Sequence, residues 1–144
     1  MKNIILFLNI IPLLVSCEAT NTAKCHKIIT VVNKTNKTIY IERNEDYPNF
    51  ESYKLDADPL NNANTTKVEA NASSKNVLPT YGNCYEGIYT SIKSGTMMVY
   101  VFDGPTLETQ GWDYIKANNL VIKRYDLTLK DLENMNWTIT YDGN

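Results

Sequence analysis

The chain offers few side chains for catalysis. It is 144 residues long and contains a single histidine, His26. Nucleophilic catalysis needs a Ser, Cys or Thr held against a base with an orienting third group, and His26 is the only imidazole that could act as this base. The sequence contains no Gly-x-Ser-x-Gly elbow, no His-Glu-x-x-His helix and no glycine-rich phosphate loop. We therefore expect no enzymatic activity and no cofactor.

Oxygen-bearing side chains gather in residues 56–62. Asp56, Asp58, Asn61 and Asn62 have a spacing that could suit calcium. The segment lacks the Asp-x-Asp-x-Asp-Gly…Glu frame, however, and Asp-Pro-Leu-Asn-Asn is typical of turns. It is therefore only a weak calcium candidate. A glycosidase-type pair could form from any two of the sixteen acids, but most of these lie in polar stretches typical of solvated surface.

Four aromatic residues lie in or near polar segments and are candidates for ligand contact. They are Tyr47, Phe50, Tyr53 and Trp112. Aromatic rings surrounded by Asn and Asp can stack on sugars or contact a partner protein. The alternative is that each ring only packs its loop against the sheet.

The N-terminal segment predicts export. Residues 1–3 carry a positive charge, and residues 4–15 are apolar except for Asn9 and Pro12. A helix of this length spans about 18 Å, well short of the roughly 30 Å hydrocarbon core of a bilayer. A cleaved signal peptide over residues 1–16 is the better interpretation. The sequence Leu-Val-Ser-Cys that ends at Cys17 resembles the lipobox of bacterial lipoproteins.

The resemblance to the lipobox implies a lipid anchor. In that family the cysteine thiol receives a diacylglyceryl group, the peptide is cut before it, and the new amino terminus is acylated. Two or three acyl chains on Cys17 would make membrane attachment effectively permanent. Residues 17–26 would then form a tether, and residues 27–144 a single β-rich domain.

Lipidation of Cys17 leaves Cys25 and Cys84 as the only possible intramolecular pair. An exported domain folds in an oxidising compartment, where a disulfide between them is expected. Free thiols are one alternative. A metal site built from both cysteines and His26 is another, although adjacent Cys-His ligands without a second close pair are not the usual zinc spacing.

The net charge argues against one class of function, and the length indicates the number of domains. Fourteen Lys and Arg against sixteen Asp and Glu give a net charge of −2, which argues against a dedicated nucleic-acid surface. The length suits one domain.

Short β-branched and aromatic segments bounded by Asn, Gly, Ser and Pro predict strands. The predicted strands are residues 27–32, 38–42, 87–92, 97–102, 120–125 and 137–141, with weaker candidates at 66–69 and 76–78. Residues 33–37 form a polar link of hairpin length between the first two. The run 97–102 is apolar on both faces and predicts a central strand covered on each side.

Two short helices are expected late in the chain. Trp112 and Ile115 could attach a helix between residues 108 and 118 to the sheet. Thr128 is a good N-cap, with Asp131 as a capping-box partner. The long polar stretch 43–63 predicts a functional or mobile loop. Together these features favour a single antiparallel β-sandwich of the immunoglobulin or transthyretin type. The alternative is an α+β fold with one curved sheet covered by the C-terminal helix.

The C-terminal segment 120–141 resembles the end of uncharacterised lipoproteins of Bacteroidetes. The shared features are an apolar strand, Arg-Tyr, a Leu-x-Leu-x-x-Leu helix, Asn-Trp and a last strand. Tyr125, Leu129, Leu132, Trp137 and Ile139 are expected to pack together as core. The resemblance implies a small β-rich domain anchored at the cell envelope and assigns no catalytic residue. We expect the anchor to lie in the outer membrane, with the domain outside the cytoplasm. We therefore expect a non-enzymatic interaction or structural domain, with an envelope protein as partner, and a glycan-binding surface module as the alternative.

Overall fold

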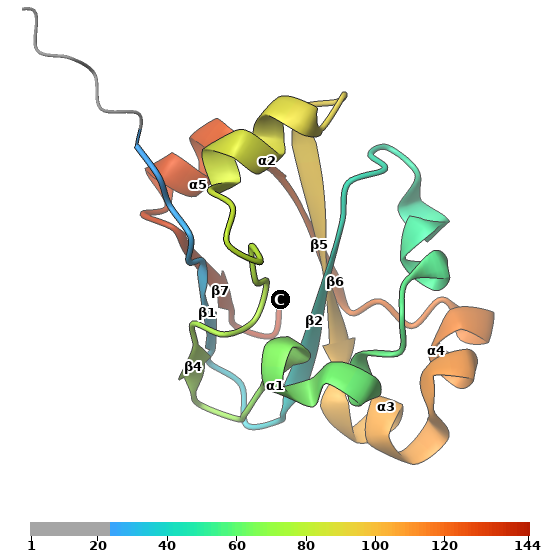
Figure 1. Ribbon diagram of the computed structural model, residues 1–144. Helices are drawn as coiled ribbons and strands as arrows, with labels where there is room; N and C mark the ends of the chain where they lie inside the picture. The colour runs from blue at the N-terminus through green and yellow to red at the C-terminus, as the bar shows by residue number, and fades with distance from the viewer. Residues whose placement is uncertain (1–23) are drawn as a thin grey trace, which may run out of the picture.

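The computed structural model describes residues 24–144 (Figure 1). The expected signal peptide 1–16, the lipobox cysteine Cys17 and most of the 17–26 tether lie outside the described residues. Helices α2 and α5 lie at one end of the molecule, where the described chain begins, and α1, α3 and α4 lie at the other (Figure 1). Within residues 24–144, no helix combines the length and apolar character needed to cross a membrane.

The larger sheet contains strands β3 (Lys67–Val68), β2 (Ile39–Asn44), β5 (Thr96–Asp103) and β6 (Lys123–Thr128), in this order and all antiparallel. Strand β5 lies between β2 and β6, and every side chain from residue 97 to 102 is fully buried. The prediction of a central strand covered on both faces is confirmed.

The smaller sheet has the order β4 (Ser73–Ser74), β1 (Thr30–Asn33), β7 (Thr138–Tyr141). Strand β1 pairs antiparallel with β4 and parallel with β7. A parallel pair joins the first and last strands of the described chain, so the two ends of the domain are held together.

The expected hairpin between residues 27–32 and 38–42 is wrong, because β1 and β2 belong to different sheets. The Asn33 amide explains the difference. Its Nδ2 donates to the carbonyl of Lys37 at 2.7 Å and to that of Glu69 at 3.0 Å. These bonds fix residues 33–37 as a crossover from one sheet to the other.

Residues 87–92, predicted as a strand, fold as helix α2 (Tyr85–Ser91). The alternation of apolar residues in this segment predicted a strand. Tyr85 and Tyr89, however, are four residues apart and therefore share one face of a helix. Both rings are buried, and the Tyr89 hydroxyl donates to the carbonyl of Leu127 at 2.8 Å. Burial of this tyrosine pair therefore prevails over strand propensity.

The helix expected between residues 108 and 118 is a pair of helices, α3 (Gly104–Gln110) and α4 (Trp112–Asn118). Gly111 separates them with a φ of +81°, a conformation that glycine adopts without steric cost. Trp112 and Ile115 are buried against the larger sheet, as expected.

Helix α5 (Leu129–Asn134) begins as predicted. The Thr128 hydroxyl accepts from the Asp131 amide at 3.2 Å, and the Asp131 carboxylate accepts from the Thr128 amide at 2.9 Å. The expected C-terminal packing is also confirmed, because Leu132 and Ile139 are buried in the core. Tyr125, Leu129 and Trp137 pack against them.

Each face of the larger sheet has its own hydrophobic cluster. One lies between the two sheets and includes Ile39, Ile41 and Val99. The other lies on the opposite face, where Tyr40, Met98, Tyr100 and Phe102 point outward from the sheet. It is covered by α3, α4 and the long polar stretch 43–63, which contains the 3-10 helices η1 (Phe50–Leu55) and η2 (Pro59–Asn62) and leads into α1 (Ala63–Thr66).

The fold is mixed α+β, with two β-sheets and several helices. The expectation of an antiparallel β-sandwich holds only as far as the presence of two sheets. It fails where helices rather than strands cover the outer face of the larger sheet, and where β1 and β7 run parallel.

Candidate functional site

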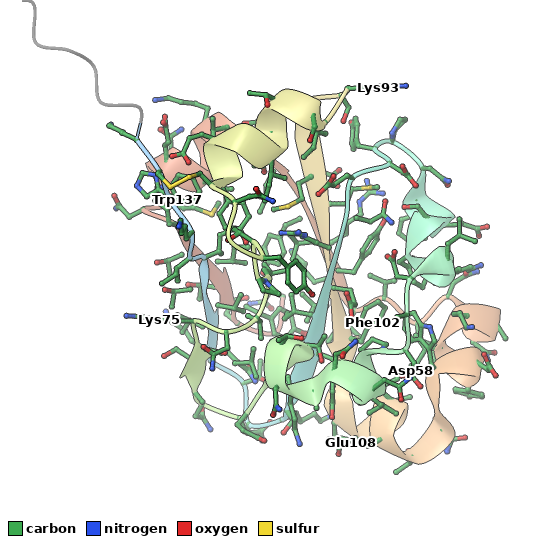
Figure 2. The ribbon with its side chains drawn as sticks, viewed as in Figure 1. Asp58, Lys75, Lys93, Phe102, Glu108 and Trp137 are labelled. Atoms are coloured by element: carbon green, nitrogen blue, oxygen red, sulfur yellow. A yellow bond between two sulfur atoms is a disulfide. The ribbon has the colours of Figure 1, made fainter. Side chains whose placement is uncertain are left out.

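The N-terminal end of the domain is fastened to α2 and to the C-terminal strand region by a set of contacts that we call the N-terminal clamp. Cys25 and Cys84 form a disulfide with a Cα–Cα distance of 5.0 Å. The His26 amide donates to the Glu86 carboxylate at 2.9 Å, and His26 Nδ1 lies 2.5 Å from it. The His26 ring stacks on Trp137 with centroids 4.0 Å apart, and Figure 2 shows Trp137 beside the disulfide.

The N-terminal clamp includes His26, which is the only histidine of the chain. Its two neighbours, Glu86 and Trp137, hold the His26 ring in one orientation. A surface hollow of about 670 Å³ lies over these side chains, but its His26 and Trp137 are engaged with each other. The clamp therefore fixes the start of the domain and is the weaker candidate for a binding site.

The four candidate aromatic residues do not form one surface. Tyr53 is 0% exposed and Trp112 is 6% exposed, so neither ring can stack on a sugar. Their ring centroids lie 6.0 Å apart within the outer hydrophobic cluster. Tyr47 and Phe50 are 38% and 39% exposed. For Tyr53 and Trp112, the core role that was the alternative is the observed one.

The two aspartates of the calcium candidate, Asp56 and Asp58, both make hydrogen bonds within the domain. The Asp58 carboxylate caps η2 by accepting from the Leu60 amide at 2.9 Å. Asp56 instead accepts from the Asn44 amide group at 3.2 Å. In residues 24–144, no group of three or more His, Cys, Asp or Glu is arranged to hold a metal ion.

A polar cleft lies beside strand β2, at the boundary between the two hydrophobic clusters. It has a volume of about 230 Å³, and three chain segments form its walls: β2, the region from η1 to α1, and the loop that precedes α2. We call it the β2 cleft. Its lining residues are Ile41, Glu42, Arg43, Asp56, Ala57, Asn62, Thr65, Thr66, Leu78, Pro79 and Tyr81.

Two carboxyl groups of the cleft, Glu42 and Asp56, have raised pKa values. Burial, followed by the negative charge of Asp56, raises the pKa of Glu42 to about 7. Burial also raises the pKa of Asp56, and the hydrogen bond from Asn44 opposes this effect. Glu42 therefore changes its charge near neutral pH. Perturbed acids in a cleft are typical of functional sites.

Arg43 supplies the opposite charge. Its Nη1 atom is buried and has no hydrogen-bond partner among residues 24–144. A buried donor without a partner costs about 1–3 kcal/mol, more when it is charged. The guanidinium lies near Tyr85, and its positive charge opposes the effect by which burial raises the pKa of the Tyr85 hydroxyl.

The third wall is a strained loop. Leu78 and Tyr81 have φ angles of +60° and +50°, in the left-handed region that side chains other than glycine rarely adopt. The Tyr85 hydroxyl donates to the Leu78 carbonyl and holds the loop in place. Tyr81 is 83% exposed and provides an aromatic ring at the cleft. Strain of this kind often accompanies binding sites.

Glu42 and Arg43 were not predicted as site residues, because they look like the polar end of a strand. Their partners contain the signal that could have found them. Glu42 and Arg43 stand opposite Tyr100 and Val99 of the apolar strand β5. Charged residues paired with the most apolar strand of a sheet need a local reason, and a polar cleft supplies one.

Comparison with known proteins returned nothing: no protein-family model, no curated protein and no solved structure matches the chain.

Proposed function

We propose that this protein is a lipoprotein of the bacterial cell envelope, of the kind found in Bacteroidetes, whose domain binds a partner through the β2 cleft and performs no catalysis. The main support for a binding role is the β2 cleft. Its walls combine two carboxyls, Glu42 and Asp56, with the cationic Arg43 and the exposed ring of Tyr81. Such a site suits a ligand that has both hydrogen-bond donors and acceptors.

The anchor is the first part of the proposal. Cys17 carries the lipid and holds the protein in the outer membrane. Residues 18–24 span at most about 25 Å when extended, and the N-terminal clamp begins at Cys25. The domain therefore stays close to the membrane surface, attached at the end that contains α2 and α5.

Membrane fractionation tests the anchor. Cys17→Ala should move the protein from the membrane to the soluble fraction. The matched control is the double variant Cys25→Ala/Cys84→Ala, which removes the other two cysteines and should remain in the membrane. Retention of Cys17→Ala in the membrane would contradict the anchor.

A filled cleft tests the binding role. Thr65 lines the β2 cleft, whereas its neighbour Asn64 is exposed and lies outside it. Cells that express wild-type protein, Thr65→Trp or Asn64→Trp would be cross-linked and extracted with detergent, and the partners identified by mass spectrometry. Wild type and Asn64→Trp should recover the same partner, and Thr65→Trp should lose it. Equal recovery with all three would exclude the cleft.

The non-enzymatic role rests on the sequence, which has one histidine and none of the nucleophile-elbow, metalloprotease-helix or phosphate-loop motifs. A glycan is the second candidate ligand, favoured by the exposed Tyr81 ring next to two carboxyls. A thermal shift against a glycan panel tests it. Release of cleaved sugar in the same samples would overturn the non-enzymatic role.

A further inference from the structure

Strand β2 has a free edge inside the cleft. Strand β5 pairs with β2 from Ile39 to Asn44, but on the other side β3 pairs only with Ile39 and Tyr40. The part of β2 from residue 41 to 44 thus extends beyond the end of β3. Figure 1 shows β2 in front of β5, with α1 near one end of it.

The direction of the backbone groups follows from the register. The Gly104 amide donates to the Thr38 carbonyl at 2.9 Å, so the backbone groups of Thr38 face β5. Successive residues of an antiparallel strand alternate between the two neighbouring strands. Tyr40 and Glu42 therefore also face β5, and the N–H and C=O groups of Ile41 and Arg43 face the cleft.

Side chains on each side of this edge carry opposite charges. Two strands paired in a sheet place directly opposite residues on the same face. A chain added beside β2 would thus place the residue opposite Glu42 on the face of Glu42 and Asp56. Its two neighbours would lie on the other face, which is the face of Ile41 and Arg43.

We propose that the β2 cleft binds an extended peptide segment of a partner protein, which adds as a strand to the edge at Ile41–Arg43 and places a lysine or arginine opposite Glu42. This inference rests on the proposed binding function and names its ligand class. The cleft volume of about 230 Å³ is smaller than the roughly 300–1,000 Å³ of pockets for drug-sized ligands, so it suits part of a longer chain. Main-chain pairing provides affinity and the basic side chain provides specificity.

Fluorescence anisotropy with labelled peptides tests the inference on the full-length protein in detergent. The probe is a short peptide of alternating threonine and valine with one central lysine. Two matched peptides replace this lysine with glutamate or N-methylate the backbone beside it. The lysine peptide should bind, and each change should weaken binding about tenfold or more.

Protein variants test the same geometry from the other side. Glu42→Gln should weaken binding of the lysine peptide, whereas Glu69→Gln, which changes an exposed acid outside the cleft, should not. Arg43→Pro and Arg43→Ala both remove the guanidinium, but only the proline removes the backbone N–H at the edge. Arg43→Pro should therefore bind less well than Arg43→Ala. Thermal unfolding of each variant verifies that it is folded.

The outcomes separate this inference from the proposed function. Binding that is indifferent to backbone N-methylation would overturn strand addition. Failure of every peptide, together with a glycan that stabilises wild type but not Thr65→Trp, would overturn the peptide and leave the binding function standing. Failure of peptides and glycans, with no partner recovered from cells, would overturn both.

Discussion

Glu42 couples the stability of the domain to pH, because its carboxyl is buried beside Asp56. Its pKa of about 7 in the folded protein is higher than the ordinary glutamate value of 4.5. Between these two values the folded state binds more protons than the unfolded state, so stability decreases as pH rises. The contribution is fully present below about pH 4.5 and is lost as pH passes through about 7.

Glu42→Gln should therefore weaken the dependence of stability on pH. The variant should be more stable than wild type by about 1–3 kcal/mol at pH 8, and the difference should shrink towards pH 5. Urea unfolding at several pH values measures it, with the exposed Glu45→Gln as the control. A constant difference between Glu42→Gln and wild type across this range would show that Glu42 does not titrate there.

The aromatic residues of the long polar stretch should separate by burial. Tyr53→Ala removes a ring that is 0% exposed and packed against Tyr100 and Trp112. We expect it to lower the free energy of unfolding by about 3–5 kcal/mol. Tyr47→Ala, at a ring that is 38% exposed, should cost less than about 1 kcal/mol. Similar losses from both would contradict the placement of Tyr53 in the core.

The residue types in the sequence argued against catalysis and against a calcium site, but they could not locate the β2 cleft. The Asp-Pro-Leu-Asn-Asn sequence indicated a turn, and in the structure the Asp58 carboxylate caps η2. Glu42, Arg43 and Tyr81 come together only through the pairing of β2 and the course of a distant loop. Nothing in the spacing of these residues along the chain encodes this contact.

At the scale of elements, the disulfide of the N-terminal clamp connects residues 59 positions apart in sequence. Closing a loop of this length stabilises the folded state by about 4 kcal/mol in the chain-entropy model. Reduction of wild type should therefore lower its free energy of unfolding by up to about 4 kcal/mol. Cys25→Ser/Cys84→Ser should unfold at the same urea concentration with and without reductant. A wild type that is insensitive to reductant would contradict a stabilising disulfide.

Elements with strong local signals were predictable and the others were not. Strand β5 has an uninterrupted apolar run, and α5 has its capping box, so both follow from the sequence. Helix α2 depends on the burial of Tyr85 and Tyr89 against distant residues, which outweighs a strand-like alternation. The expected hairpin does not form for a similar reason. The side-chain amide of Asn33 donates a hydrogen bond to the carbonyl of Glu69, 36 residues away in the sequence.

At the scale of the whole molecule, the proposed anchor would determine which end of the domain lies near the membrane. The described chain begins at the end of the domain that contains α2 and α5 (Figure 1). The proposed lipid on Cys17 therefore holds that end near the membrane. The β2 cleft is formed by β2, the η1–α1 region and the loop before α2. The proposed partner would meet this cleft on a domain whose first residues are held by the N-terminal clamp.

Site-specific photo-cross-linking on intact cells tests the central claim most directly. Tyr81, which is 83% exposed at the cleft, would be replaced by benzoylphenylalanine, and Tyr114, which is 44% exposed on α4, would serve as the control position. We predict that light produces a discrete covalent adduct from position 81 and none from position 114. Adducts from position 114 alone, or none from either position, would contradict a partner bound at the β2 cleft.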